Sequence, residues 1–395
     1  MKKIKYILAS GAKYHHFSIA KVLHQRDQLS KIISGYPWFK LKKEKIPKNL
    51  VSANGILQML RYPFIRNRLF NNFKKIPSFL DVLNRKYIDK KICKIIEQEI
   101  DADVLITLCP TGLKAGREMQ KKNKLYICER SSAHILYQEK LLREEYKIFM
   151  NKDFKINPYY IESELQMYEE SNVILVPSQF VKNTFDKNLK NKVYVNEFGT
   201  DTENFFPDNK IRKSDKFFDI LFIGQISLQK GLHYLVEAFD KLKHPNKRLH
   251  IVGMDTGDKH FFDKILNNEN IIIYGHVPQN KLNEIINKCH VFVLPSIQDG
   301  FGIVTLQALS AGCPIIVTKN TGPVEIINKY NCGSVVPIRE ADKILYSLQE
   351  LVDDRHKLEF YTRNANKFAS NNTWDVYVDK LNEIVSEALK KIDQQ

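Results

Sequence analysis

The sequence predicts an α/β protein built from two Rossmann-like domains, each with a parallel sheet wrapped by helices. Three observations indicate this fold class. The chain has 395 residues, which is too long for one ordinary core. Short β-branched runs alternate with helical patterns throughout, and the alternation restarts after a Pro- and charge-containing stretch at residues 207–216. We therefore expect domains at 1–206 and 207–372, followed by a C-terminal helix at 373–395.

The strands of both domains are expected where short apolar runs lie between turn residues. In the first domain the expected ranges are 5–9, 31–34, 104–108, 125–128, 173–177 and 192–196. In the second domain strands are expected near Ile220, Leu249, Ile271, Val291, Ile315 and Ser334. At the C-terminus, Thr373 is placed to cap a helix that carries Trp374, Val378 and Leu381 inward.

Positive charge is concentrated at the start of the chain. Residues 1–100 contain 22 basic and 6 acidic residues, a net charge of +16, whereas residues 101–200 carry +1 and residues 201–395 carry −1. This asymmetry predicts that the N-terminal domain meets an anionic partner such as a lipid surface or a phosphorylated acceptor, with a solvated basic surface as the alternative. No nucleic-acid reader motif accompanies the basic residues, so we expect no nucleic-acid partner.

The hydropathy pattern predicts a cytoplasmic protein without a membrane span. No run reaches the roughly 18 apolar residues that a span needs, and residues 1–12 favour a first strand over a signal peptide. The six cysteines are scattered without zinc-ligand spacing. Residues 59–76 place Arg66, Arg68, Lys74 and Lys75 beside an apolar helical face. That pattern is shared by core-facing helices and by helices lying on an anionic membrane, and both interpretations stay open.

The most informative segment is 291–327, VFVLPSIQDGFGIVTLQALSAGCPIIVTKNTGPVEII. It predicts a buried strand, a turn, a glycine-flanked loop, a helix starting near Gly302, and a second strand. Gly300 and Gly302 allow the backbone to approach a ligand, and the amides of Phe301, Gly302 and Ile303 would open the helix, where phosphate is favoured. A Gly-x-Gly turn alone is weak evidence for a nucleotide site.

The whole pattern resembles the family 4 glycosyltransferases of GT-B fold, whose signature has Pro-Ser, an acidic residue before Gly-Phe-Gly, and Glu-Ala further on. The matching residues are Pro295, Ser296, Gly300, Phe301, Gly302, Ala308, Gly312 and Pro314. Residues 222–231 resemble the family's donor-phosphate loop, and residues 248–255 and 271–282 its nucleotide-base wall. The resemblance covers residues 160–330 well and residues 1–150 in outline.

This resemblance implies two sheets facing a central cleft, with the C-terminal helix packing back on the N-terminal domain. It also implies a retaining transfer of a sugar from a nucleotide diphosphate to a glycan or lipid-linked acceptor, as in the synthesis of cell-surface polysaccharide or glycolipid. No metal or other cofactor is expected. The residues expected at the donor are Gly11, Gly224, Gln225, Gly253, His276, Val277, Gly300, Phe301, Gly302, Ile303 and Gln307.

Three positions depart from the family pattern. Asp299 stands where a glutamate that contacts the donor sugar is typical, and Gln307 where a glutamate that binds the ribose is typical. Gln225 stands where an arginine is typical, so Lys230 is expected to be the principal cation on the diphosphate. Negative charge grows there as the nucleotide leaves, and cations and amides stabilise it. With the leaving phosphate taking the acceptor's proton, no separate general base is required.

Further candidate residues lie in the first domain. His134, in the loop after the strand at 125–128, is a candidate contact for the transferred sugar or the acceptor, resembling a histidine of the family. His15 and His16 follow the first strand, and solvated side chains are the favoured interpretation there. Asp101-Ala102-Asp103 spells a metal-binding DxD but precedes its strand, so we expect a turn leading into that strand.

Two other functions share the expected architecture. A non-catalytic subunit that binds a nucleotide sugar would tolerate the neutral Gln225 and Gln307. A nucleotide-sugar 2-epimerase would need further acids and histidines facing the sugar, and the sequence shows no such cluster. Turnover of the donor separates an enzyme from a binding module.

Overall fold

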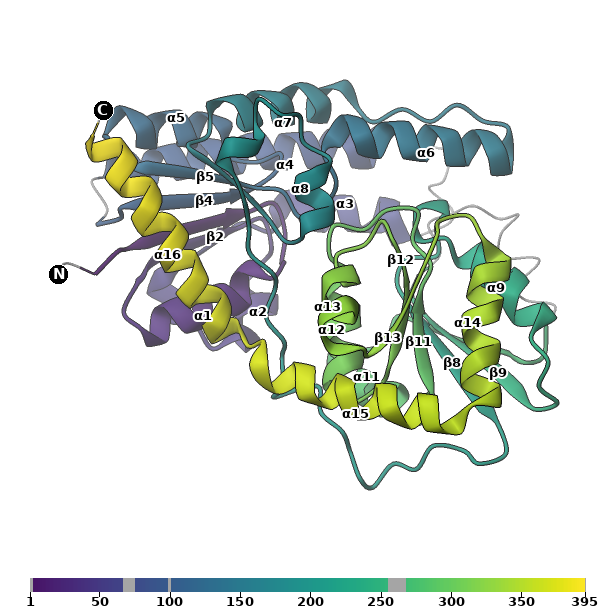
Figure 1. Cartoon of the computed structure of the whole chain (residues 1–395). Helices are drawn as coiled ribbons and strands as arrows, with labels where there is room; N and C mark the ends of the chain where they lie inside the picture. The colour runs from purple at the N-terminus through teal and green to yellow at the C-terminus, as the bar shows by residue number, and fades with distance from the viewer. Residues whose placement is uncertain (1–2, 67–74, 99–100, 255–267, 395) are drawn as a thin grey trace.

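The computed structural model describes residues 3–66, 75–98, 101–254 and 268–394, and its strands form two parallel sheets with helices packed around them (Figure 1). One sheet has seven strands in the order β3-β2-β1-β4-β5-β6-β7, and the other has six in the order β10-β9-β8-β11-β12-β13. The predicted fold class, α/β with two Rossmann-like domains, is confirmed. The expected domain limits at 206 and 372 remain predictions.

The N-terminal sheet consists of β1 (Tyr6–Ser10), β2 (Leu29–Ser34), β3 (Val51–Ala53), β4 (Val104–Leu108), β5 (Leu125–Glu129), β6 (Val173–Val176) and β7 (Val193–Val195). Its helices are α1 (His16–Gln25), α2 (Trp38–Leu41), α3 (Ile56–Arg66), α4 (Lys75–Glu97), α5 (Leu113–Lys121), α6 (Ile135–Met150), α7 (Pro158–Glu170) and α8 (Gln179–Asn183). Each strand expected from the sequence is present. The short strand β3 is an additional one that the apolar pattern did not predict.

The C-terminal sheet consists of β8 (Phe218–Ile223), β9 (Lys247–Val252), β10 (Ile271–Gly275), β11 (Val291–Leu294), β12 (Ile315–Thr318) and β13 (Gly333–Val336). The helices that alternate with these strands or follow them are α9 (Leu232–Lys241), α11 (Gln279–Lys288), α12 (Ile303–Ser310), α13 (Val324–Tyr330), α14 (Ala341–Asp353), α15 (Arg355–Asn371) and α16 (Trp374–Asp393). All six strands lie where the sequence predicts them.

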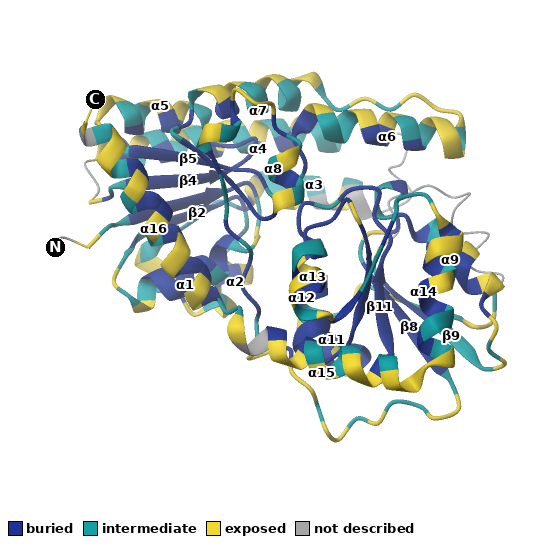
Figure 2. Ribbon diagram, viewed as in Figure 1, coloured by how far each residue is buried: buried dark blue, intermediate teal, exposed yellow. Residues whose placement is uncertain are grey.

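The central strands of both sheets are buried on both faces, as Figure 2 shows by their dark colour. In β4 and β11 every residue is buried, which explains why these strands appear in the sequence as continuous apolar runs instead of alternating ones. Most exposed residues lie on the helices and loops. Central strands of this kind are therefore easier to recognise in the sequence than the strands at the edges of the sheets.

Each sheet has one point where the order of the strands reverses, between β1 and β4 in the first and between β8 and β11 in the second. The chain leaves the two strands at such a point toward opposite faces, and the crevice that opens at their carboxyl ends is the usual ligand site of open α/β sheets. We call these places the N-terminal and C-terminal switch points.

The C-terminal helix crosses from one domain to the other. α15 packs against α12 and α13, the Thr200 amide donates to the Asn372 carbonyl at 2.6 Å, and α16 then lies along α1 (Figure 1). The Tyr6 hydroxyl at the start of β1 donates to Asn382 Oδ1 at 2.7 Å. This confirms the expected return of the last helix to the N-terminal domain.

A second contact between the domains surrounds Glu145, a fully buried carboxylate on α6. Its Oε1 lies 2.8 Å from His233 Nε2 and accepts from the Tyr234 hydroxyl at 3.0 Å, and its Oε2 accepts from Arg339 Nε at 2.7 Å. All three partners belong to the C-terminal domain. We call this group the Glu145 latch.

Within the described ranges, no helix is long and apolar enough to cross a membrane. The six cysteines are free thiols, and the Sγ atoms of Cys109 and Cys128 lie 3.0 Å apart. Of the basic amphipathic stretch at 59–76, residues 67–74 lie outside the described residues. Asp103 accepts the Lys5 amide at 2.9 Å just before β4, so the DxD sequence forms the expected turn into that strand.

Candidate active site

The C-terminal switch point brings together the two charged side chains that the sequence singles out. Lys230 ends a short turn after β8, Asp299 lies in the loop after β11, and the lysine ammonium donates to the aspartate carboxylate. Their side chains are 22% and 14% exposed, so the pair is shielded but still reachable from the crevice. A cation and an acid thus stand where a ligand of this sheet is expected.

Backbone hydrogen bonds join the loops that follow β8, β11 and β12. The Ile297 amide donates to the Gln229 carbonyl at 2.9 Å, and the Asp299 amide donates to the Asn320 carbonyl at 2.9 Å. Gly231 has φ of +64°, and a Cβ there would lie 2.0 Å from the Pro295 carbonyl oxygen, so this position requires glycine. Lys230 is therefore fixed by its neighbours, which favours a preorganised site.

The helix beyond Asp299 opens on glycine. Gly302, with φ of +70°, is the N-cap residue of α12, and no side chain caps this end. The Asp299 carboxylate pairs with Lys230 and does not cap the helix. A glycine-opened helix beside a lysine combines amide donors with a positive charge, the arrangement that binds phosphate.

The expected base wall lies along the carboxyl ends of β8, β9 and β10. The Gly253 amide donates to the Gly275 carbonyl at 2.9 Å, and a Cβ on Gly253 would stand 1.7 Å from the Gly224 carbonyl oxygen. His276 is exposed and Val277 half-buried just beyond β10. The structure thus brings these predicted residues to one sheet edge, next to Lys230.

The two glutamines that replace charged family residues differ in their surroundings. Gln225 is exposed at the start of the Lys230 loop. Gln307 lies on α12, and its Oε1 is buried without a hydrogen-bond partner among the described residues. A buried acceptor without a donor is costly, so a ligand hydroxyl would find an acceptor ready there.

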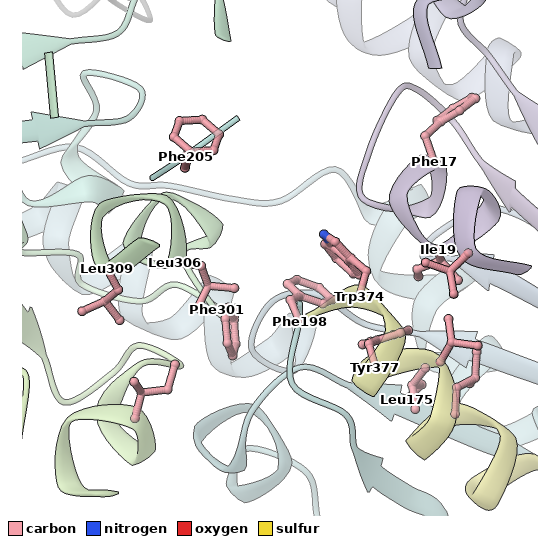
Figure 3. Packing of buried hydrophobic residues seen from close by; sticks show 14 of the residues in the cluster. Phe17, Ile19, Leu175, Phe198, Phe205, Phe301, Leu306, Leu309, Trp374 and Tyr377 are labelled. Atoms are coloured by element: carbon pink, nitrogen blue, oxygen red, sulfur yellow. The ribbon is translucent and has the colours of Figure 1, made fainter. Parts of the chain in front are cut away.

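Phe301 has a different role from a ligand-facing side chain. Its ring is 1% exposed and packs 5.2 Å from the Phe198 ring, beside Trp374 and Tyr377 in the core that joins the domains (Figure 3). Only its backbone is available to a donor. The neighbouring Ile303 keeps a side chain that is 36% exposed.

Loops of the N-terminal domain contact the loop after β11 directly. The Ser178 hydroxyl donates to the Gly300 carbonyl at 2.7 Å, and the Ser132 hydroxyl donates to Gln298 Oε1 at 3.0 Å. A Cβ on Gly300 would lie 2.1 Å from the Ser131 carbonyl oxygen. The carboxyl edges of the two sheets therefore face each other across Gly300.

His15 and His16 are not solvated, and this prediction is wrong. Both rings pair with the Glu129 carboxylate at the end of β5, and His16 Nε2 lies 2.6 Å from Glu129 Oε2. The three side chains are 6%, 0% and 2% exposed. Burial alone would raise the pKa of Glu129, but the two histidines hold it well below its usual range. The sequence pattern predicted the strand β5. It did not predict that the Glu129 carboxylate at the end of this strand pairs with two distant histidines.

This acid and histidine cluster is also one that the sequence did not reveal. The ligand atoms of His15, His16 and Glu129 all lie within 4.8 Å of one another, so the group has the spacing to hold a metal ion. The Glu129 carboxylate also pairs with both histidine rings without an ion between them. The His15 ring packs 4.2 Å from the Phe198 ring, at the junction of the domains.

His134 has a structural role as a helix cap, and its predicted contact with the sugar or the acceptor stays a prediction. It is the N-cap residue of α6, where Nδ1 accepts from the Leu136 amide at 3.3 Å, and its ring packs against Tyr168 and Phe185. Burial, together with the nearby Arg130 guanidinium, lowers the pKa of His134 to about 4. The neutral ring therefore caps α6 through Nδ1.

Gly11 lies at the N-terminal switch point, directly after β1. Its carbonyl accepts from Gln58 Nε2 and Asn84 Nδ2, each at 3.0 Å. A Cβ on Gly11 would stand 3.2 Å from Arg85 Nη1, so a guanidinium approaches the backbone here. Sequence reasoning singled out Gly11 but missed Arg85.

Two cavities lie away from the Lys230 and Asp299 pair. One of about 390 Å³ borders the interdomain crossing and includes Lys21 and Trp374 in its lining. The other, of about 680 Å³, lies between α4, α5 and α7. Chemistry and topology, and not cavity size, therefore identify the candidate site.

Comparison with known proteins agrees with this geometry. Residues 202–368 match the family described as glycosyl transferases group 1. The capsular polysaccharide biosynthesis glycosyltransferase CapM of Staphylococcus aureus is 25% identical over 264 residues, covering 60% of this chain and 68% of CapM. The uncharacterized glycosyltransferase MJ1607 of Methanocaldococcus jannaschii is 32% identical over 154 residues, covering 38% of this chain and 39% of that protein. The match to MJ1607 thus spans well under half of either chain.

Among solved structures, HepE of Anabaena in complex with UDP is similar over 97% of this chain and 100% of that chain, with a TM-score of 0.71 and 13% sequence identity. At this identity the likeness shows the fold alone, two Rossmann-like domains around one cleft. Residues 202–368 therefore match the glycosyl transferases group 1 family, and the fold of the chain is GT-B.

Proposed function

We propose that this protein is a retaining glycosyltransferase that moves a hexosyl group from a nucleotide-diphosphate sugar to a glycan or lipid-linked acceptor, in the synthesis of cell-surface polysaccharide or glycolipid. The observation that carries the proposal is the Lys230 and Asp299 pair at the C-terminal switch point, beside the glycine-opened helix α12. The name of CapM, a capsular polysaccharide enzyme, supports the acceptor class.

The donor diphosphate would replace Asp299 as the partner of Lys230. As the anomeric bond breaks, negative charge grows on the β-phosphate, where Lys230 and the amides that open α12 stabilise it. Asp299, freed from the lysine, would accept hydrogen bonds from the sugar hydroxyls. The leaving phosphate takes the proton of the acceptor hydroxyl as the new bond forms on the same face, so the step requires neither a metal nor a separate base.

The nucleoside would lie along the Gly224, Gly253 and His276 edge, with Gln307 Oε1 accepting from a ribose hydroxyl. The solved neighbour HepE was crystallised with UDP and also with UDP-glucose. UDP-hexoses are therefore the first donors to test. A ligand at 100 times its dissociation constant stabilises the folded protein by about 2.7 kcal/mol, which a thermal-shift panel detects.

The decisive experiment measures transfer from the donor identified in that panel. Lys230→Ala is expected to lower kcat/KM by roughly 10²- to 10³-fold, the usual loss when one stabilising donor of a developing oxyanion is removed. Lys241→Ala is the matched control, because Lys241 is paired on the exposed surface of α9. Equal turnover in the two variants would reject the proposal.

A peripheral contact with an anionic membrane through residues 59–76 is part of this proposal. α3 exposes Ile56, Met59 and Leu60, which are 65%, 47% and 55% exposed. The basic residues of the stretch would add about 1 kcal/mol each near anionic lipid. Co-sedimentation with anionic vesicles should fall on charge reversal at Arg66, Arg68, Lys74 and Lys75. Unchanged co-sedimentation would remove the membrane contact and leave the transferase assignment standing.

The cluster of His15, His16 and Glu129 favours one second candidate, a nucleotide-sugar 2-epimerase, because it supplies the acid and histidines that such an enzyme needs. Product analysis separates the two activities. A transferase releases a nucleoside diphosphate only as the sugar is transferred or hydrolysed, whereas an epimerase interconverts two nucleotide sugars. Binding without either product would mark a non-catalytic subunit.

A further inference from the structure

Arg85 occupies the N-terminal switch point although it comes from a helix and not from the strand loops. It projects from α4 between the ends of β1 and β4. Its Nη1 donates to Thr111 Oγ1 at 3.0 Å, and the same atom would lie 3.2 Å from a Cβ on Gly11. The guanidinium therefore stands in the crevice where a ligand of this sheet is expected.

A shared carboxylate holds this arginine in place. Asp81 Oδ2 accepts from Arg85 Nε at 2.7 Å and from the Tyr160 hydroxyl at 2.7 Å, while Asp81 Oδ1 lies 2.7 Å from Arg61 Nη1. Two guanidinium groups thus share one aspartate. The Arg85, Asp81 and Arg61 side chains are 14%, 6% and 28% exposed, so this group keeps a net positive charge in a partly dehydrated place.

Donor atoms remain available on both arginines. Within the described ranges, Arg61 Nε is buried with no hydrogen-bond partner, and Arg85 Nη2 makes no hydrogen bond, although the guanidinium lies over the Tyr160 ring. A buried positive charge with unused N–H groups is costly unless an anion completes it. A purely structural arginine would instead satisfy its donors with the helix and sheet that it joins.

The two switch points therefore match each other in charge. The C-terminal one has Lys230 beside Asp299, and the N-terminal one has Arg85 beside Asp81. In both, an aspartate carboxylate pairs with the cation. Planar guanidinium groups suit phosphate because they donate two parallel hydrogen bonds.

We propose that Arg85, assisted by Arg61, binds a phosphate or diphosphate group of the acceptor at the N-terminal switch point. This inference rests on the proposed transferase function and names the acceptor's chemical class, a phosphorylated molecule. Asp81 stays bound to Tyr160 while the phosphate takes the remaining guanidinium donors. The acceptor is thereby held on the sheet edge that faces Gly300 and the donor loop.

The test uses the full chain with UDP at saturating concentration, so that the donor site is filled, and titrates inorganic pyrophosphate by calorimetry. The native chain should bind pyrophosphate at a second site. Arg85→Gln should weaken that binding at least tenfold, and Arg85→Lys should weaken it less, because charge remains but the paired donors are lost. Arg117→Gln, on an exposed ion pair of α5, is the control and should bind like the native chain.

Absence of a pyrophosphate site in the presence of UDP, or equal affinity in Arg85→Gln, would overturn the inference. If Arg85→Gln does not fold, as circular dichroism would show, Arg61→Gln provides the same test, with a several-fold loss expected. Normal UDP affinity in these variants separates this inference from the donor assignment, since failure of the proposed function would appear as absent UDP binding in every chain.

A short prenyl diphosphate in place of pyrophosphate identifies the source of the phosphate. Binding at least several-fold tighter than that of pyrophosphate assigns a lipid-linked acceptor, as the exposed apolar face of α3 suggests. Equal binding assigns a water-soluble phosphorylated acceptor. In both cases the dependence on Arg85 must persist for the inference to hold.

Discussion

The two switch points have the same topology but are built from different parts of the chain. At the C-terminal one, Lys230 and Asp299 lie a few residues beyond β8 and β11, in the loops that leave the strands. At the N-terminal one, Arg85 and Asp81 come from α4, which lies between β3 and β4 in sequence and reaches the crevice from the side. A site made by strand loops has a local sequence pattern, whereas a site completed by a distant helix does not.

The largest expected effect concerns the Glu145 latch, which helps to hold the two sheet edges together. Glu145→Ala would leave Arg339 and His233 without their buried carboxylate, and breaking a buried pair in this way costs about 3 to 5 kcal/mol. We expect a lower urea midpoint and faster amide hydrogen exchange in α6.

Glu144→Ala is the matched control for the latch. Glu144 is 41% exposed and pairs with the same Arg339, at 3.2 Å, so its loss should cost no more than about 1 kcal/mol. Equal destabilisation by the two substitutions would show that the domains are held by the remaining interface, and not by the latch.

Much of this architecture is predictable from the sequence because parallel strands buried on both faces are continuous apolar runs. The C-terminal switch point was also predictable, since Lys230 follows β8 and Asp299, Gly300 and Gly302 follow β11 within a few residues. The partners of Glu129 were not, because the two histidines are more than a hundred residues away and nothing local marks their pairing. Arg85 was missed for the same reason, as one of many basic residues on a helix.

A pH titration tests whether His134, which caps α6 in the loop after β5, contributes to the stability of the folded chain. The folded pKa of about 4 lies below the ordinary value of 6.5, so the unfolded chain binds more protons between these pH values. Stability is therefore complete above pH 6.5 and falls as the pH drops toward 4. At about 1.4 kcal/mol per pKa unit, the loss is at most about 3.5 kcal/mol.

His134→Asn keeps a capping acceptor without a titrating group, since asparagine is a good N-cap residue. Thermal unfolding of this variant should depend less on pH between 4 and 6.5 than that of the native chain. An identical pH profile would show that other groups cause the acid loss. Unchanged transfer activity at pH 7.5 would agree with a role in stability alone.

Gly300→Ala tests the contact between the two edges. Its methyl group would overlap the Ser131 carbonyl, and relieving such an overlap costs about 1 to 3 kcal/mol. We expect transfer to fall roughly 10- to 100-fold while UDP affinity changes only a few-fold, because Lys230 is not disturbed. Equal loss of both would mean that Gly300 itself contacts the nucleotide.

Gln225→Arg should produce the smallest effect. It places a cation at an exposed position of the donor loop, where one charge pair contributes at most about 1 kcal/mol. Donor affinity should rise a few-fold at low salt, and the gain should shrink as ionic strength increases. No gain at low salt would indicate that Gln225 lies away from the diphosphate.

We assign the donor to the C-terminal switch point and the acceptor phosphate to the N-terminal one. Calorimetric titration of UDP into Lys230→Ala and Arg85→Gln tests this assignment most directly. Our account predicts that Lys230→Ala loses most of its UDP affinity, whereas Arg85→Gln binds UDP as the native chain does. Native-like UDP binding by Lys230→Ala, or its loss in a folded Arg85→Gln, would contradict the assignment of the donor to the C-terminal switch point.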